Sequence, residues 1–282
     1  MLLSFLAVLE DLRLREGLDG WVVRHTAGAL RPRSHRHLEL ELNLVVAGTA
    51  SYLLDDRRYD LSAGTLTWLF PDKEHVLVDE SADHALWWAV FRPAAVARTA
   101  TSAHARPLLE RDPVGRYSRR IHPQRVQRLA ALFGELRDAE TLDDGLFNAG
   151  LAYLLALAWR AFLDSTDVVA DCEVHPAVDA VARLLQADPD AGDLAALARR
   201  VGLSPPHLSR LFVAQMGVSM TRFRNQQRLD RFMRLYGQGR TTALAAAHQA
   251  GFGSYAQFHR VFRKETGRRP SALRTSATDD LT

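Results

Sequence analysis

Residues 193–274 contain the pattern that decides the fold of the C-terminal third. The stretch Asp193-LAALARRV-Gly202-LSPPHLSRLF has the same organisation as the later stretch Thr241-TALAAAHQA-Gly251-FGSYAQFHRVF. In each, an apolar helix leads into a glycine, an apolar residue and a serine that starts a second helix. Glycine tolerates the positive φ of such a turn, and we expect Ser204 and Ser254 to cap the second helices. The repeat predicts two helix-turn-helix units in tandem.

The charge distribution supports a nucleic-acid partner for these units. Residues 194–275 carry 15 basic residues against two acidic ones, a net charge of +13, whereas the whole chain has a net charge of only +3. A concentrated basic surface is typical of nucleic-acid binding. The second helix of a helix-turn-helix unit is the one that enters the DNA major groove. The sequence therefore predicts double-stranded DNA as a partner.

Residues 174–275 resemble the DNA-binding domain of AraC/XylS-type transcription regulators. The resemblance rests on residues in both units, namely Leu203-Ser204, Leu208-Ser-Arg210-Leu-Phe212, Ala247, Gly251-Phe252, Phe258-His-Arg260-Val-Phe262, Gly267, Pro270 and Arg274. It implies a regulator that also contacts RNA polymerase. On the two recognition helices, residues 205–215 and 255–264, we expect Leu208, Leu211, Phe212, Phe258 and Phe262 to form the core.

The outward positions of these helices are the candidate DNA-binding residues, which are Pro206, Ser209, Arg210, Tyr255, Ala256, His259, Arg260 and Arg263. Arg210 is the strongest candidate for base recognition, because arginine bonds guanine O6 and N7 with two hydrogen bonds. Arg263 is expected to neutralise phosphate. Pro205 and Pro206 donate no backbone N–H, so phosphate contacts at that helix start should be few.

Alternating apolar residues interrupted by turns predict short strands over residues 20–92. Helical periodicity predicts helices at 122–139, 143–164, 176–187 and 220–236. The fold class is therefore α+β: a cupin-like β-barrel with a helical connector, followed by an all-α domain. The expected divisions are a sensor at 1–115, a dimerisation connector at 116–166, a linker at 167–174, the DNA-binding domain at 175–276 and a tail at 277–282.

Within the sheet region, Gly28-ALRPRS-His35-Arg-His37-LEL-Glu41-LNLVVA-Gly48 resembles the first motif of cupin barrels, and Gly64-TLTWLF-Pro71-Asp-Lys-Glu-His75 resembles the second. Strand parity places His35, His37, Glu41 and Asn43 on one face. Together with His75, these residues form the candidate ligand pocket. His35, His37, Glu41 and His75 match the ligand set of metal-bearing cupins and suit Zn, Fe, Mn or Ni.

The same histidines also fit a pocket without metal, in which they hydrogen-bond a polar or anionic effector. Arg24, Arg31 or Arg33 near the mouth would then meet a carboxylate. Of Trp68, Trp87 and Trp88, at most one is expected to contact a ligand, because aromatic residues in strands usually belong to the core.

The remaining features concern compartment and assembly. Cys172 is the only cysteine, which excludes an internal disulfide and fits a cytoplasmic protein. Residues 1–17 are interpreted as an amphipathic helix rather than a signal peptide, and no apolar run is expected to cross a membrane. The segment 143–164 is apolar almost all round and must be buried, either in its own chain or against a partner. Its apolar face, Leu146–Phe162, predicts a homodimer formed through residues 122–164, in which replacing Leu154 or Leu155 with Glu gives monomers or insoluble protein.

These observations predict a DNA-binding regulator responsive to a small polar molecule, and not an enzyme. Two alternatives remain. A metal-dependent cupin enzyme with a DNA-binding appendage would use the histidine cluster for catalysis, but that hypothesis explains nothing in residues 176–275. A ligand-independent regulator would use the barrel only for dimerisation and partner binding.

Overall fold

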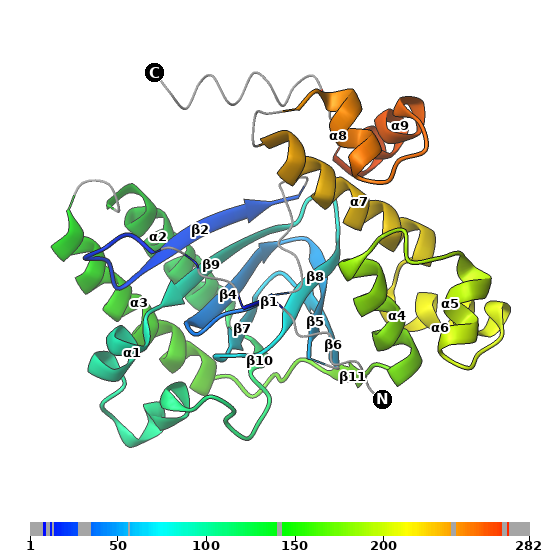
Figure 1. Cartoon of the computed structure of the whole chain (residues 1–282). Coiled ribbons are helices and arrows are strands. Elements are labelled where there is room, and N and C mark those ends of the chain that lie inside the picture. The colour runs from blue at the N-terminus through cyan, green and yellow to red at the C-terminus, as the bar shows by residue number, and fades with distance from the viewer. Residues whose placement is uncertain are drawn as a thin grey trace. The chain divides into compact units, whose positions relative to one another are not determined.

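A computed structural model describes residues 8–9, 12, 14–27, 35–55, 57–139, 143–237, 241–266 and 270 (Figure 1). Its contacts divide the chain into an N-terminal unit, residues 1–27 and 34–172, and a C-terminal unit, residues 28–33 and 173–282. Several residues of the predicted motifs lie outside the described residues, namely Gly28, Arg31, Arg33, Gly267 and Arg274.

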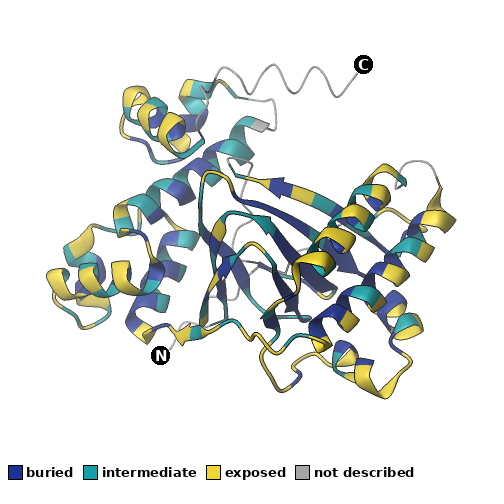
Figure 2. Ribbon diagram, turned by 180° about the vertical axis from the view of Figure 1, so that it is seen from behind, coloured by how far each residue is buried: buried dark blue, intermediate teal, exposed yellow. Residues whose placement is uncertain are grey.

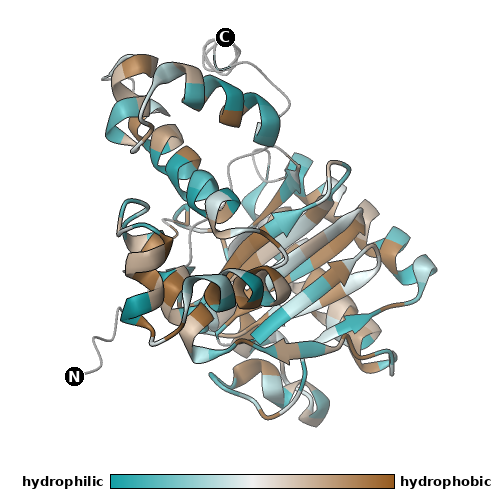
Figure 3. Cartoon of the chain, turned by 90° about the vertical axis from the view of Figure 1, so that its right-hand side faces the viewer, coloured by the Kyte–Doolittle hydropathy of each residue, from teal (hydrophilic) through white to brown (hydrophobic). Residues whose placement is uncertain are grey.

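Two sheets form the framework of the N-terminal unit. One has the order β1 (Val8–Leu9), β3 (His35–Arg36), β8 (His75–Glu80), β5 (Thr49–Leu54), β6 (Arg57–Ser62) and β11 (Asp171–Glu173). The other has the order β10 (Ser118–Arg120), β7 (Thr65–Leu69), β4 (Leu40–Ala47), β9 (Ala85–Phe91) and β2 (Gly20–Thr26). The described strands carry much of the hydrophobic colour in Figure 3. The expected strand-rich N-terminal domain is confirmed.

Side-chain alternation along β4 separates two environments. Leu40, Leu42 and Leu44 belong to a core that includes the helices of this unit. Val45 belongs to a smaller cluster with residues of the opposite sheet, such as Tyr52 and Leu77. Glu41 and Asn43 share the parity of Val45, because successive side chains of a strand point to opposite faces. The space between the two sheets is therefore partly polar, while the leucine face is covered by helices.

The helical cover consists of α1 (Pro93–Thr99), the 3₁₀ helix η1 (Ala103–Leu109), α2 (Pro123–Ala139) and α3 (Asp144–Leu163). Aromatic contacts join it to the sheet. Trp87 stacks on Phe133 with ring centroids 5.5 Å apart, and Trp68 meets Trp159 edge to face at 5.6 Å. Burying such rings stabilises the core strongly. Figure 2 shows α2 and α3 buried on one side and exposed on the other.

Helix α3 differs from two expectations. Leu154 and Leu155 are 0% and 1% exposed within the single chain, so these two residues of the apolar face are buried in their own subunit and not on a surface that a second copy could contact. The leucines instead pack in the core between the sheet and the helices. Within the described part of the chain, α3 is also long and apolar enough to span a bilayer by length and composition, contrary to the expectation that no segment would be. Its apolar composition is explained in this structure by burial against the sheet.

The C-terminal unit consists of helices α4 (Pro176–Ala187), α5 (Leu194–Arg200), α6 (Pro205–Met216), α7 (Met220–Gly237), α8 (Ala243–Gln249) and α9 (Tyr255–Thr266). The pairs α5–α6 and α8–α9 are the two predicted helix-turn-helix units. Their turns contain Gly202 at φ +71° and Gly251 at φ +94°, the left-handed conformation that favours glycine.

One predicted cap is absent. Ser254 accepts a hydrogen bond from Gln257 N at 3.1 Å, whereas Ser204 makes no side-chain cap bond. Pro206 removes one of the two backbone N–H groups that such a cap can bind, and Ser204 does not use the other, that of His207.

Two segments have more strand than expected. Val8–Leu9 is a strand, which corrects the helix expected there; most of the remaining residues up to 13 lie outside the described residues. The predicted linker contains β11, and Val168 forms an isolated bridge with Arg119. Asp171 also forms ion pairs with Arg57 and Arg116, so this segment is held to the N-terminal unit before the chain enters α4.

Candidate functional site

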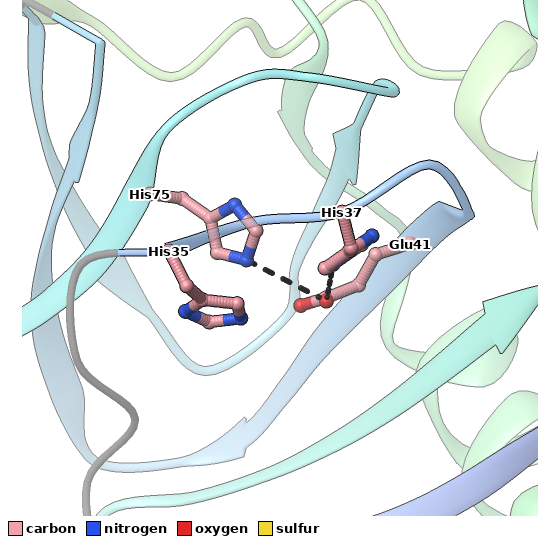
Figure 4. A group of neighbouring side chains, drawn as sticks. All are labelled: His35, His37, Glu41 and His75. Carbon is pink, nitrogen blue, oxygen red and sulfur yellow. Dashed lines mark hydrogen bonds and ion pairs between the residues drawn. The ribbon is translucent and has the colours of Figure 1, made fainter. Parts of the chain in front are cut away.

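Four polar side chains meet between the two sheets of the N-terminal unit. His35 lies on β3, His37 directly follows that strand, Glu41 lies on β4 and His75 begins β8 (Figure 4). One potential ligand atom from each lies within 4.8 Å of the others. The residues are 9%, 2%, 8% and 4% exposed in that order. The structure therefore brings together the four residues that the sequence proposed as a metal or ligand site.

Backbone pairing explains this convergence. β3 and β8 pair antiparallel with His35 opposite His75. The turn before β8 is held to the first motif by a 2.8 Å hydrogen bond from Asp72 N to His37 O. Because β4 then continues with Glu41 facing the interior, segments separated by more than thirty residues deliver their side chains to one point.

Hydrogen bonds orient the rings. His37 Nδ1 lies 3.0 Å from Glu39 O, and His75 Nδ1 lies 2.9 Å from Lys73 O. Since a carbonyl oxygen only accepts, Nδ1 is the donor in each ring, and Nε2 is the atom turned toward the cluster. His37 Nε2 lies 2.9 Å from Glu41 Oε2, and Asn43 Nδ2 donates to Glu41 Oε1 at 2.9 Å. His75 Nε2 is 3.7 Å from Glu41 Oε2 and has no hydrogen-bond partner among the described residues.

Charge in this cluster is concentrated on one pair. Burial alone would raise the pKa of Glu41, but the hydrogen bond from His37 and the nearby imidazoles lower it well below its usual range. Burial would lower the pKa of His37, but the hydrogen bond and charge of Glu41 outweigh burial and raise it. The metal-free pair is therefore an imidazolium and a carboxylate, with a proton on the Nε2 atom that a metal would require.

A pocket of about 260 Å³ lies close to the cluster. Two of its lining residues are cross-strand neighbours of cluster residues, since Leu69 pairs with Glu41 and Leu54 pairs with His75. Lys73 lines the same pocket and forms ion pairs with Asp55 at 3.1 Å and Asp112 at 2.8 Å. The sequence analysis did not identify this pocket: Leu69 and Lys73 lie in the second cupin-like motif, but Asp112 lies beyond the predicted strands and belongs to no motif.

A second buried polar group was also missed. His25 Nε2 lies 2.8 Å from Glu80 Oε2, and both side chains are at most 3% exposed. The His25 ring stacks on Trp88 at 5.8 Å. Burial raises the pKa of Tyr52, and the charges of Glu41 and Glu80 raise it further, so the Tyr52 hydroxyl stays neutral. The alternation of side chains along each strand could have shown that His25 and Trp88 face the interior. It could not have shown that they meet, because they lie on two different strands and neither strand carries a motif.

Arg24 and the three tryptophans considered for the pocket lie on two different faces of the sheet. Arg24 is exposed and lies over the Trp87 ring at 5.4 Å, and its strand partner is Trp87 on the helix-covered face. Arg24 therefore faces away from the cluster, and its expected role at the mouth is wrong. Trp68 and Trp87 are core residues on that face, while Trp88 faces the interior.

The two recognition helices expose most of the predicted DNA-binding residues. On α6, Pro206 and Arg210 are exposed and Ser209 is half-buried, while Leu208 and Phe212 are buried. Leu211, expected in the core, is half-buried. On α9, Phe258 and Phe262 are buried. The outward residues of α9 line a shallow hollow composed of Tyr255, Ala256, His259, Arg260, Arg263 and Lys264. Lys264 is an addition to the predicted set.

Two family models match the chain. The AraC-like ligand binding domain matches residues 22–156, and a helix-turn-helix domain matches residues 197–276. The chain is 35% identical over 89 residues to the arabinose operon regulatory protein of Escherichia coli K12, and 38% identical over 82 residues to that of Salmonella typhimurium LT2. These matches cover 32% and 29% of this chain, and only 30% and 29% of those relatives.

Among solved structures, ToxT from Vibrio cholerae aligns over 90% of this chain and 96% of its own, with 13% identity and a TM-score of 0.38, a similarity too low to bear on function. The two family models, in contrast, cover both units described above. The chain therefore belongs to the AraC/XylS-type family, with an AraC-like ligand-binding domain and a helix-turn-helix domain in one polypeptide.

Proposed function

We propose that the protein is a sequence-specific, DNA-binding transcription regulator that responds to a small polar molecule bound between the sheets of its N-terminal unit. The observation that carries this proposal is the pairing, in one chain, of two exposed basic recognition helices with a buried polar cluster. The regulator acts in the cytoplasm together with RNA polymerase, and catalysis is not part of its role.

Residues on both recognition helices support DNA contact. Arg210 on α6 and Arg260 on α9 are exposed. Among the described residues, neither arginine forms an ion pair with an acidic side chain. An unpaired exposed arginine is free to bond guanine in the major groove. The remaining outward residues, Pro206, Ser209, Tyr255, Ala256, His259 and Arg263, surround these two.

The test is to select DNA fragments with the purified full chain at moderate salt and to measure binding of variants to the selected site. Arg210→Ala and Arg260→Ala should each weaken specific binding by about 1–3 kcal/mol. Arg183→Ala is the matched control, since it removes one charge from α4 where Arg183 pairs with Asp179. Unchanged affinity for Arg210→Ala would contradict the role of α6.

For the effector, the interior supplies donors and acceptors rather than a purely apolar surface. Besides the four-residue cluster, Asn43 Oδ1 is buried and has no hydrogen-bond partner among the described residues. A buried acceptor without a partner is costly, so it favours a ligand that donates to it. Raised thermal stability with candidate polar molecules, lost in the His35→Ala, His37→Ala double variant, would support this site.

We also propose that His35, His37, Glu41 and His75 hold a divalent metal, with zinc, iron, manganese and nickel as candidates. The donor set fits, because imidazole and carboxylate are the common ligands of these ions. The carbonyl partners of His37 and His75 also fit, because ligating histidines usually donate their second N–H to a carbonyl or carboxylate. A bound ion would supply a Lewis-acidic contact for the effector.

Elemental analysis of protein purified without chelator tests this proposal. About one equivalent of metal in the wild type, and none in His37→Ala or His75→Ala, is the expected result. If no metal is found but both variants still lose the effector response, the metal proposal is wrong and the histidines bind the effector directly.

We propose that the protein is a homodimer, with a contact surface different from the buried leucines. The exposed face of α3 carries a stripe with the spacing 3-4-3-4-3, composed of Leu146, Ala149, Tyr153, Ala156, Arg160 and Leu163. Leu146, Tyr153 and Leu163 are 63%, 48% and 40% exposed. This spacing keeps the stripe on one seam, which is apolar or aromatic except for Arg160, and the two alanines allow close approach of a second helix.

Light scattering at micromolar concentration tests the dimer. Ala156→Glu places a charge in the centre of the stripe and should give a folded monomer. Gln127→Glu adds the same charge at an exposed position of α2 and serves as a control. A monomeric wild type would contradict the proposal.

A further inference from the structure

Asp190 links three parts of the C-terminal unit. It lies in the loop between α4 and α5, and its carboxylate accepts a hydrogen bond from Arg228 Nη2 of α7. The loop is fixed again two residues later, where Arg224 Nη2 of α7 donates to Gly192 O. Asp190 N bonds Asp188 Oδ1 at 3.0 Å, which sets the shape of the loop itself. The first helix-turn-helix unit is therefore joined to α7 at its entrance.

The same carboxylate contacts the turn of the second unit. A Cβ atom placed on Gly251 would lie 2.3 Å from Asp190 Oδ2, closer than real Cβ atoms come to another heavy atom, so a side chain here would require the carboxylate to move. Gly251 is thus the residue that lets the carboxylate approach this backbone. We call Asp190, Arg228 and Gly251 the latch.

Helix α7 divides its packing between the two units. Near its start, Phe223 packs edge to face against Phe212 of α6 with centroids 5.6 Å apart. Further along, Phe232 packs against Phe258 of α9 at 4.3 Å. Arg228 lies between these two contacts in the sequence. A single helix resists stretching but bends and twists, so a second connection beside it restricts the remaining motion.

We infer that Asp190 is a positioning residue that fixes the separation and relative orientation of recognition helices α6 and α9. The role in DNA binding that we assign to Asp190 rests on the proposed function, whereas its effect on the orientation of α6 and α9 does not. The pair is not a major source of folding stability, because the Asp190 side chain is 44% exposed and exposed ion pairs contribute little. Its consequence is that the two helices present their contacts to DNA at one fixed spacing.

A distance measurement tests the geometry without DNA. In the full chain with Cys172→Ser, spin labels are placed at the exposed positions Ala214→Cys on α6 and Lys264→Cys on α9. Asp190→Asn should broaden the distance distribution about twofold, because the two units then sample more orientations. Asp179→Asn removes an equal charge from α4 and should leave the distribution unchanged. Equal widths in the wild type, Asp190→Asn and Arg228→Gln would overturn the inference.

A binding measurement tests the consequence. On the selected site, insertion of one base pair between the two contacted segments should weaken wild-type binding about tenfold or more, because adjacent base pairs differ in rotation about the DNA axis. Asp190→Asn should lose less than about threefold on the same insertion. Arg228→Lys keeps a cation and should behave closer to the wild type than Arg228→Gln.

The two measurements separate the failures. No sequence-specific binding by the wild type, together with a broadened distribution in Asp190→Asn, would remove the proposed function and keep the latch. Normal specific binding, with the same insertion penalty in wild type and Asp190→Asn, would remove the latch and keep the function. Should Asp190→Asn not fold, the Arg228→Gln and Arg228→Lys pair gives the same comparison.

Discussion

Adding a divalent metal to chelator-treated protein should raise the unfolding midpoint of the N-terminal unit. The four ligand atoms already lie within 4.8 Å of one another and are buried, so binding requires little rearrangement of the chain. The main local cost is loss of the proton between His37 Nε2 and Glu41 Oε2. A ligand at one hundred times its dissociation constant stabilises the native state by about 2.7 kcal/mol. For a domain of this size, that corresponds to a rise of about 5–11 °C.

The assay is thermal unfolding followed by tryptophan fluorescence, since Trp68, Trp87 and Trp159 lie in the core of this unit. Zinc, manganese, nickel and anaerobic ferrous iron are titrated separately. His37→Ala and His75→Ala should abolish the rise, whereas His104→Ala, which removes an exposed imidazole elsewhere in the unit, should keep it. Absence of a rise with all four ions, or an equal rise in the His37→Ala, His75→Ala double variant, would refute the reasoning.

Further predictions concern single residues. Arg263→Ala should weaken binding to all DNA sequences about equally and reduce the slope of log affinity against log salt by about 1, as measured by a salt titration. Leu155→Glu, unlike a charge on the exposed stripe, should destabilise the subunit by more than about 3 kcal/mol in chemical denaturation, because an unpaired charge replaces a fully buried side chain. Thr242→Ala should cost about 1 kcal/mol in the same assay, since the Thr242 side chain accepts a bond from Ala245 N; no loss would show that the cap is dispensable. The folded-state pKa of Tyr52 is raised, so its contribution to stability is complete below pH 10 and is lost as pH rises above that value. Tyr52→Phe should therefore lose less stability than the wild type between pH 10 and 11; equal losses would contradict the buried neutral hydroxyl.

The helix-turn-helix units were predictable because their determinants are local. Helical spacing places Phe212, Phe258 and Phe262 on one face of each second helix, and the positive φ of Gly202 and Gly251 is a property of single residues. Both facts concern residues within one or two helical turns of each other. The absence of a cap bond at Ser204 was not predictable from the serine alone, since the same residue type at position 254 does form one.

The inward cluster was predictable in part. The parity of Glu41 and Asn43 follows from strand geometry, and the resemblance to cupin motifs supplied His75. The His25–Glu80 pair and the pocket near Lys73 were not predictable, because each joins strands whose register no motif reveals.

The sequence by itself thus determined the tandem helix-turn-helix units, the basic charge of their region and the alternation of the strands. Only the tertiary structure decided which partner covers each face. It placed Leu154 and Leu155 against their own sheet, turned Arg24 toward Trp87, and brought the Asp190 carboxylate to Gly251 and Arg228. Local patterns indicate that a face must be buried or that a charge needs a partner. Which residues supply that partner depends on contacts between segments far apart in the chain.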